Sequence, residues 1–196
     1  MVSTATNSPL DICARALVLI GAEPLTSFED QTTEALVASN MYEDVARASL
    51  LNTRWRFATD QAVLNRLSAA PTGRYDAAYQ LPSATLMVHA VTENDYPIEY
   101  QRYGDKIYCD ASEPSVLICD YTFRVLEVDW PAYFALAVQF GMASIFATSI
   151  ARDSSLANMF EERSRNQMTK ARTLDSQQQT TRKLNTSRFI AERRSY

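Results

Sequence analysis

Glycine and histidine are scarce in this sequence, and their scarcity removes several common kinds of functional site. The chain has 4 glycines and 1 histidine among 196 residues. Loops that cradle phosphates need closely spaced glycines, and the patterns GxGxxG and GxxxxGK[ST] are both absent. A zinc site built on several histidines is impossible with one, and neither HExxH nor GxSxG occurs. We therefore expect a protein that is not an enzyme and that uses no cofactor and no metal.

Cysteine is also rare, with three residues that lie far apart: Cys13, Cys109 and Cys119. An odd number of cysteines without a CxxC pair predicts neither a disulfide framework nor a zinc site. Each cysteine lies among apolar residues. We therefore expect three buried free thiols.

The remaining groups that could carry catalysis are isolated in the sequence. His89 lies within the apolar run Leu86–Val91, where a lone histidine is usually structural or exposed. The adjacent acidic pairs at 29–30, 43–44 and 161–162 are typical of solvated surface. A hydrolase whose acid and base come from distant parts of the chain is an alternative, although no motif supports it.

Long apolar runs are missing as well. No run reaches the length that we expect of a membrane span, and the polar start Met1–Ser8 lacks the order of a signal peptide. Hydrophobic residues make up 46% of the chain, which is enough for a sizeable core. We expect a soluble protein, made in the cytoplasm, with one domain or one domain that carries an insertion.

Two helices are predicted in the first part of the chain, residues 1–55. The first runs from Ser8 to Ile20, with Ser8 as its N-cap and Gly21 at its end. The second runs from Thr32 to Trp55, and its apolar residues recur at helical spacing (Leu36, Met41, Val45, Ala48 and Leu51). We expect these two helices to form an antiparallel hairpin.

Short apolar runs separated by turn signals follow over residues 56–128. They predict a small inserted antiparallel β-sheet domain of roughly four to six strands. The segment Tyr100–Tyr108 is a good hairpin candidate, with Gly104-Asp105 at its tip.

The chain returns to helix over residues 129–174. Asp129 is the expected N-cap of a long helix whose residues 132–150 are almost wholly apolar, so we place this helix at the centre. An amphipathic helix is predicted from Ser154 to Leu174, and an extended basic arm over 175–196. On this helix we expect apolar residues to pack inward (Leu156, Met159, Phe160 and Met168) and basic residues to face out (Arg163, Arg165, Lys170 and Arg172). The predicted fold class is therefore α+β but mainly α, an antiparallel helical bundle with an inserted small antiparallel β-sheet domain and an extended C-terminal arm.

Charge is unevenly distributed along the chain. The net charge is −4, yet residues 163–196 alone carry +7, which leaves −11 for the rest. Such a basic segment fits either a tail that binds nucleic acid or an arm that docks on a partner protein. The spacing of apolar residues among the charges favours the arm. The predicted contact residues of this arm, on a partner protein, are Arg182, Lys183, Leu184, Arg188, Phe189, Ile190, Arg193 and Arg194.

The order of these parts resembles the tail tubular protein A family, the head-to-tail connectors (adaptors) of short-tailed bacteriophages. The resemblance rests on Ile12–Leu25, Ala46–Phe57, the hairpin Tyr103–Tyr108, the long helix after Trp130-Pro131, and Ala171–Gln178. Residues 185–196 match no pattern of that family.

The resemblance implies a structural virion protein at the head–tail joint, made in the host cytoplasm. Twelve copies would form a homo-oligomeric ring between the portal protein and the tail nozzle or tail tube. The basic C-terminal arm would bind the portal or a neighbouring subunit. Genomic DNA would pass through the channel of the ring without sequence recognition, and no small-molecule substrate would be involved. The alternative is a nucleic-acid-binding protein with a basic tail.

Overall fold

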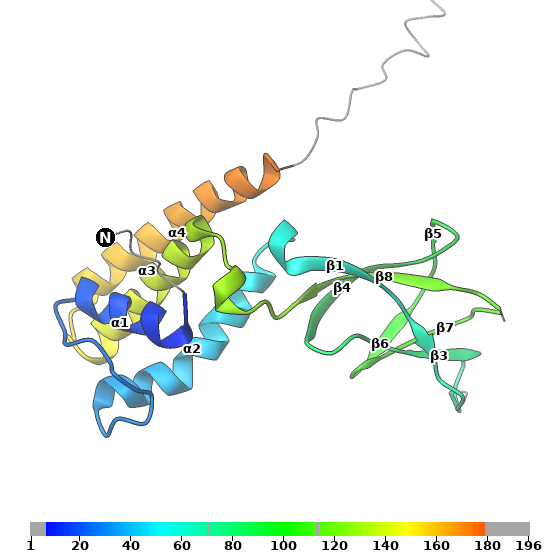
Figure 1. The fold of residues 1–196 in the computed structure, drawn as a ribbon, viewed down its shortest axis with the longest axis horizontal. Coiled ribbons are helices and arrows are strands. Elements are labelled where there is room, and N and C mark those ends of the chain that lie inside the picture. Colours follow the sequence, from blue (N-terminus) through cyan, green and yellow to red (C-terminus); the bar gives the residue numbers. More distant parts are fainter. Residues whose placement is uncertain (1–6, 70, 113, 179–196) are drawn as a thin grey trace, which may run out of the picture.

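The computed structural model describes residues 7–69, 71–112 and 114–178, and within them the chain forms two modules that lie end to end (Figure 1). The helical module comprises α1 (Pro9–Leu19), α2 (Thr33–Leu51), α3 (Ala132–Ser149) and α4 (Ser154–Ser176). The β module comprises β1 (Thr59–Val63), β2 (Asn65–Arg66), β3 (Ala77–Gln80), β4 (Thr85–Glu93), β5 (Tyr96–Pro97), β6 (Gln101–Tyr103), β7 (Lys106–Cys109) and β8 (Leu117–Phe123). Two 3-10 turns, η1 (Arg56–Ala58) and η2 (Glu127–Asp129), lie where the chain passes between the modules.

The β module consists of two antiparallel four-stranded sheets, ordered β1-β8-β4-β5 and β2-β3-β7-β6. The two sheets share one apolar core, in which Val91 and Leu117 of the first sheet join Tyr79 and Ile107 of the second. The predicted hairpin at Gly104-Asp105 is confirmed, since β6 and β7 pair on either side of it. This module therefore has a hydrophobic core of its own.

The prediction of a mainly helical bundle with a small inserted sheet is wrong. The structure is about 46% helical and 21% strand, with four helices and two four-stranded sheets, and its fold is mixed α+β. Several strands are only two to four residues long and pair with partners distant in sequence. Such strands leave weak local signals, which is why the sequence understates the sheet content.

The first helix begins where the sequence predicts. The Ser8 hydroxyl accepts a hydrogen bond from the Asp11 backbone N–H at 3.1 Å, and the Asp11 carboxylate accepts one from the Ser8 N–H at 3.2 Å. This reciprocal capping box satisfies N–H groups that a helix start leaves unpaired. After the helix, Gly21 adopts a φ of +81°, which a residue with a Cβ rarely takes.

α3 lies at the centre of the helical module and packs against α1, α2 and α4. Phe134, Met142 and Phe146 on α3 are fully buried. Contrary to expectation, the stretch Ala132–Ala151 is long and apolar enough to cross a membrane by length and composition alone, but half of it is buried inside the structure. That burial is typical of a core helix. The N-cap is Pro131, and Asp129 lies in η2 instead.

The buried face of α2 differs from the predicted stripe. Leu36, Met41 and Leu51 are 64%, 38% and 39% exposed. The buried positions of α2 are Ala35, Ala38, Tyr42, Ala46 and Leu50. Small side chains let a helix approach its neighbours closely, so an alanine-rich face packs inward here and leaves leucines in solvent. The expected hairpin of α1 and α2 is also not the main contact of either helix, because both pack mainly on α3.

Candidate functional site

The predicted contact residues all lie outside the described residues. The structure describes the chain up to Gln178, so it places none of Arg182, Lys183, Leu184, Arg188, Phe189, Ile190, Arg193 and Arg194. The docking role of this segment stays a prediction. What the structure does describe is the end of α4, which precedes this segment in the chain.

This end of α4 is anchored by Asp175. Asp175 is 4% exposed, and its carboxylate accepts hydrogen bonds from the Arg56 backbone N–H at 3.1 Å and from the Tyr133 hydroxyl at 3.2 Å. Burial, reinforced by the Asp175 charge, raises the pKa of Tyr133 to about 12. Residues 175 and 176, which the sequence assigns to the extended arm, belong to α4 instead, and the rest of the predicted arm lies almost wholly outside the described residues.

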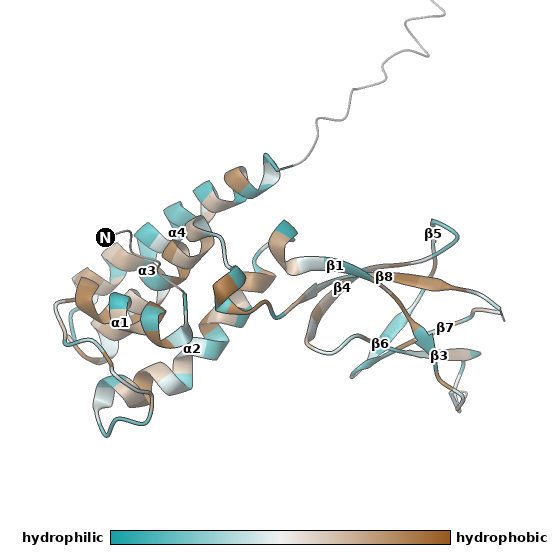
Figure 2. Ribbon diagram, viewed as in Figure 1, coloured by the Kyte–Doolittle hydropathy of each residue, from teal (hydrophilic) through white to brown (hydrophobic). Residues whose placement is uncertain are grey.

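The basic residues of α4 face outward, as predicted. Arg163, Arg165, Lys170 and Arg172 are all exposed, and much of α4 is hydrophilic in Figure 2. Arg165 pairs with Glu161 on the same helix. Phe160 and Met168 are buried, whereas Met159, also predicted to face inward, is 37% exposed.

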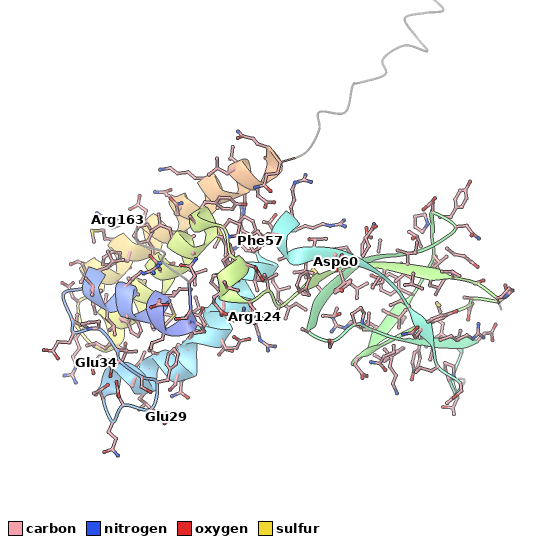
Figure 3. All side chains as sticks on the ribbon, viewed as in Figure 1. Glu29, Glu34, Phe57, Asp60, Arg124 and Arg163 are labelled. Atoms are coloured by element: carbon pink, nitrogen blue, oxygen red, sulfur yellow. The ribbon has the colours of Figure 1, made fainter. Side chains whose placement is uncertain are left out.

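Arg124 occupies the junction between the modules, where Figure 3 labels it. Its guanidinium donates to both carboxylate oxygens of Glu43 on α2, at 2.9 to 3.2 Å, and to the carboxylate of Glu127 in η2. The Tyr42 hydroxyl donates to Glu127 at 3.0 Å, and the Trp130 ring lies 5.5 Å from the guanidinium. These contacts join the strand β8, the turn η2 and the helix α2 into one network.

The pKa shifts at this junction follow from its contacts. Hydrogen bonds from Arg124 lower the pKa of Glu43. Burial, together with the charge of Glu127, raises the pKa of Tyr42. Although burial opposes it, hydrogen bonds to both carboxylates raise the pKa of Arg124. The network is thus a cluster of ionised side chains at the junction of the two modules.

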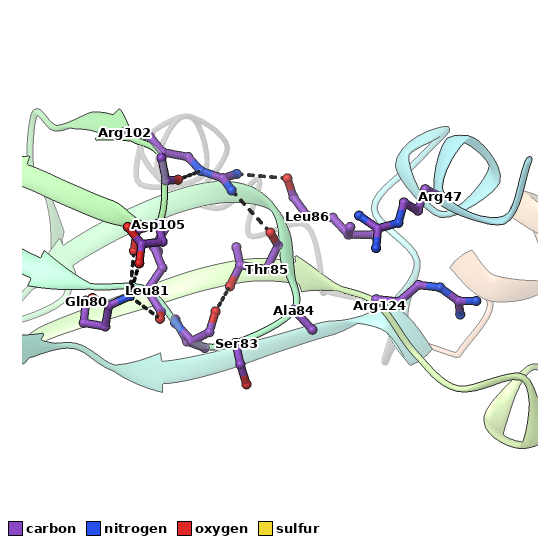
Figure 4. Close-up of a pocket in the computed structure, with 12 residues that line it drawn as sticks. Arg47, Gln80, Leu81, Ser83, Ala84, Thr85, Leu86, Arg102, Asp105 and Arg124 are labelled. Carbon is purple, nitrogen blue, oxygen red and sulfur yellow. Dashed lines mark hydrogen bonds between the residues drawn. The ribbon is translucent and has the colours of Figure 1, made fainter. Parts of the chain in front are cut away.

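A cavity of about 640 Å³ lies beside this junction and is lined by Arg47, Arg102 and Arg124 (Figure 4). Each arginine is already engaged within the chain. Arg47 donates to Glu43, and Arg102 donates to the backbone carbonyls of Gly104, Leu86 and Thr85. Arg47 therefore pairs within α2 and Arg102 ties together segments of the β module, while Arg124 alone of the three reaches across the junction. Their donors serve carboxylates and carbonyls of the chain, which leaves this cavity a poor anion site.

Beyond the exposed side chains of α2 described above, two further apolar surfaces of the helical module face solvent. The first, called here the α1/α3 groove, has a volume of about 520 Å³. Val18, Leu19 and Leu136 in its lining are 58%, 41% and 38% exposed. The second, called here the η2 turn, consists of η2 and its N-cap residue Leu126, residues 126–129. It presents Leu126 and Val128, which are 66% and 59% exposed. Large apolar side chains that gather in solvent mark sites of interaction.

The groups considered for catalysis are structural in the described residues. His89 shares a 2.7 Å hydrogen bond with the Thr122 hydroxyl, and burial lowers its pKa. All three cysteines are buried and free, as predicted. No cluster of three or more His, Cys, Asp or Glu residues that could hold a metal occurs in the part of the chain that the structure describes.

The acidic pairs are mainly solvated surface. Glu161 and Glu162 are exposed, and the carboxylate of Asp30 closes a local turn by accepting from Thr26 and Ser27. Glu43 departs from the prediction, because it is bound to Arg124.

The chain matches no known protein-family model and no curated protein.

Proposed function

We propose that this chain is a structural subunit of the head–tail joint of a tailed bacteriophage. In this role it forms a twelve-membered ring between the portal protein and the tail nozzle, and DNA passes through the central channel. The proposal starts from the resemblance to the tail tubular protein A family. It is supported by one observation, namely that beyond α2 the helical module exposes large apolar side chains on two further surfaces, the α1/α3 groove and the η2 turn.

Two separate apolar surfaces are what a ring subunit requires. In a ring each copy contacts one neighbour through one surface and the other neighbour through a different surface. The α1/α3 groove involves α1 and α3, and the η2 turn lies between β8 and α3. Apolar side chains that gather in solvent mark sites of interaction, which is what contacts between neighbouring subunits require.

The C-terminal segment contributes a third contact in this proposal. Residues 179–196 follow the anchored end of α4, and their basic and apolar residues bind the portal. Because Asp175 is buried, a deletion that tests this role should begin after Gln178. The shortened protein should keep its fold and bind the portal more weakly. An unchanged affinity would contradict the docking role.

Mass photometry tests the ring directly. The full chain is measured alone and after mixing with the portal protein of the same virus. We expect a complex whose mass equals the portal plus a ring of copies, with ring particles visible by negative-stain electron microscopy. A protein that stays monomeric at all portal concentrations would refute the proposal.

A nucleic-acid-binding role is the second candidate, and the exposed basic residues of α4 favour it. Arg163, Lys170 and Arg172 face solvent on that helix. Filter binding at several salt concentrations separates the two roles. Tight binding by the monomer, with a steep salt dependence, would favour nucleic-acid recognition, whereas weak binding without a preferred sequence fits a DNA channel.

A further inference from the structure

We propose that the α1/α3 groove of one copy receives the η2 turn of a second copy. Leu126 and Val128 enter the groove, and Asp129 pairs with Arg15 at its edge. The inference rests on the proposed function, because it assigns the two surfaces through which neighbouring subunits of the ring meet. It commits to a second copy of this chain as the occupant of the groove.

The shape of the η2 turn suits insertion. Leu126 and Val128 point into solvent, while Glu127 between them is 5% exposed and is held by Arg124 and Tyr42. On the far side, the Trp130 indole N–H donates to the Val125 carbonyl at 3.1 Å. Both ends of the turn are therefore fixed, and two aliphatic side chains project from a rigid base. A rigid element loses little entropy when it binds.

The composition of the groove suits aliphatic partners. Its lining is almost entirely apolar, with Val18, Leu19, Leu136 and Phe140 among its residues. Arg15 is the charged residue of this lining, and the structure gives its guanidinium one hydrogen bond, to Asn7 at 3.2 Å. A polar ligand would find few partners here, whereas leucine and valine side chains would leave water.

Charge selects the η2 turn over the C-terminal segment as the occupant. Beside Val128 the turn carries an exposed carboxylate, Asp129, which complements Arg15. Residues 179–196 instead bring Arg182, Lys183, Arg188, Arg193 and Arg194, and these carry the same sign as Arg15. Charges of opposite sign across an interface fix its register, and charges of like sign exclude a partner.

The α1/α3 groove and the η2 turn lie at different ends of the helical module, so the η2 turn that enters a groove comes from another copy. The groove includes the carboxyl end of α1, which lies at the end of the helical module away from the β module (Figure 1). The chain between β8 and α3 lies at the junction with the β module. Because the two surfaces do not overlap, one copy can use both at once. Association then proceeds head to tail, as ring closure requires.

Disulfide trapping between copies tests this pairing. Two full-length variants, Val18→Cys and Val128→Cys, are mixed and oxidised, and products are separated by non-reducing electrophoresis. The native cysteines do not compete, since burial raises the pKa of Cys13 to about 12 and also raises those of Cys109 and Cys119. We expect mixed dimers at least tenfold above those from either variant alone. Trapping captures weak contacts, so a mainly monomeric sample is still informative.

Val63→Cys supplies the matched control. Val63 is 61% exposed on β1, which is as exposed as Val18 at 58%, but it belongs to neither surface. Mixed with Val128→Cys, it should give only background dimers. Equal trapping of Val18→Cys and Val63→Cys would overturn the proposal, as would trapping of Val18→Cys copies only with one another.

Charge reversal identifies the register. Arg15→Asp and Asp129→Arg should each reduce Val18–Val128 trapping several-fold, and a mixture in which both charges are exchanged should restore it. Deleting residues 179–196 should leave trapping unchanged; a large increase would mean that this segment occupies the groove, and the proposal would fail. Rings that form on the portal without Val18–Val128 trapping would refute this pairing while leaving the proposed function in place.

Discussion

Replacing Arg124 with alanine tests whether the junction network holds the two modules in place. The Arg124 side chain is 14% exposed, and that of Glu127 is 6% exposed. Removing one member of a buried ion pair strands the other charge and costs about 3–5 kcal/mol. The pair with Glu43 adds less, because Glu43 is 46% exposed and exposed pairs contribute about 0–1 kcal/mol. Because Arg124 keeps some contact with water, we take the lower end of the range and expect a loss of about 3–4 kcal/mol.

Urea unfolding measures this loss. Trp55 and Trp130 are both buried in the helical module, so their fluorescence reports its unfolding. With an m-value of about 2 kcal/mol per M, the Arg124→Ala midpoint should fall by roughly 1.5–2 M. Arg47→Ala is the control, because Arg47 contacts the same Glu43 but is 54% exposed, and its loss should be about 0.5 kcal/mol or less. Equal losses in the two variants would refute the reasoning.

The pH dependence of stability, compared between the native protein and Arg124→Ala, gives a second measure of this network. Hydrogen bonds from Arg124 lower the pKa of Glu43 in the folded state. A carboxyl group whose pKa is lowered by folding stabilises the fold above its pKa in the unfolded chain, which is about 4.3 for glutamate. This stabilisation is lost as the pH falls through the pKa of the folded state. The stability difference between the native protein and Arg124→Ala should therefore be largest at neutral pH and should narrow below about pH 4.

Asp175→Ala should lower the free energy of unfolding by about 1–3 kcal/mol, because the Arg56 N–H and the Tyr133 hydroxyl lose their buried acceptor. Thermal unfolding followed by circular dichroism measures this loss, and a change under about 0.5 kcal/mol would mean that the Asp175 contacts are dispensable. Tyr79→Phe should be neutral or stabilising, since among the described residues the buried Tyr79 hydroxyl has no hydrogen-bond partner, and a clear loss in the same assay would contradict this. The three buried thiols should resist a disulfide reagent at pH 8 until denaturant is added, since the pKa of Cys13 is raised to about 12; fast labelling of the native protein would count against their burial.

Local features of the fold could be predicted from the sequence because the residues that cause them are neighbours. Ser8 and Asp11 are three positions apart and cap each other, so the start of α1 is visible in the chain. Gly104-Asp105 likewise predicts the β6–β7 hairpin, whose strands lie on either side of it. The central position of α3 follows from its composition, because a helix that is apolar on all sides must be covered on most of them.

Features that depend on distant partners could not be predicted in this way. Arg124 and Glu43 are 81 positions apart, and neither carries a local sign of the other. Leu36 recurs at the spacing of a buried stripe, yet the face of α2 that packs inward is set by how closely a neighbouring helix approaches. The sequence places candidate contacts only in residues 179–196. The α1/α3 groove and the η2 turn were missed, since each depends on which side chains the fold leaves exposed.

The junction network and the proposed docking surface share one element, the η2 turn. Glu127 at the centre of the turn is buried and bound to Arg124, while Leu126 and Val128 on either side are held in solvent. A carboxylate is costly to bury, so a turn of this kind is stable only while its arginine is in place. Loss of Arg124 would free the turn to rearrange, and the two aliphatic side chains would then have to be ordered again upon binding. The contacts that fix the β module on the helical module therefore also prepare the surface through which one copy would bind the next.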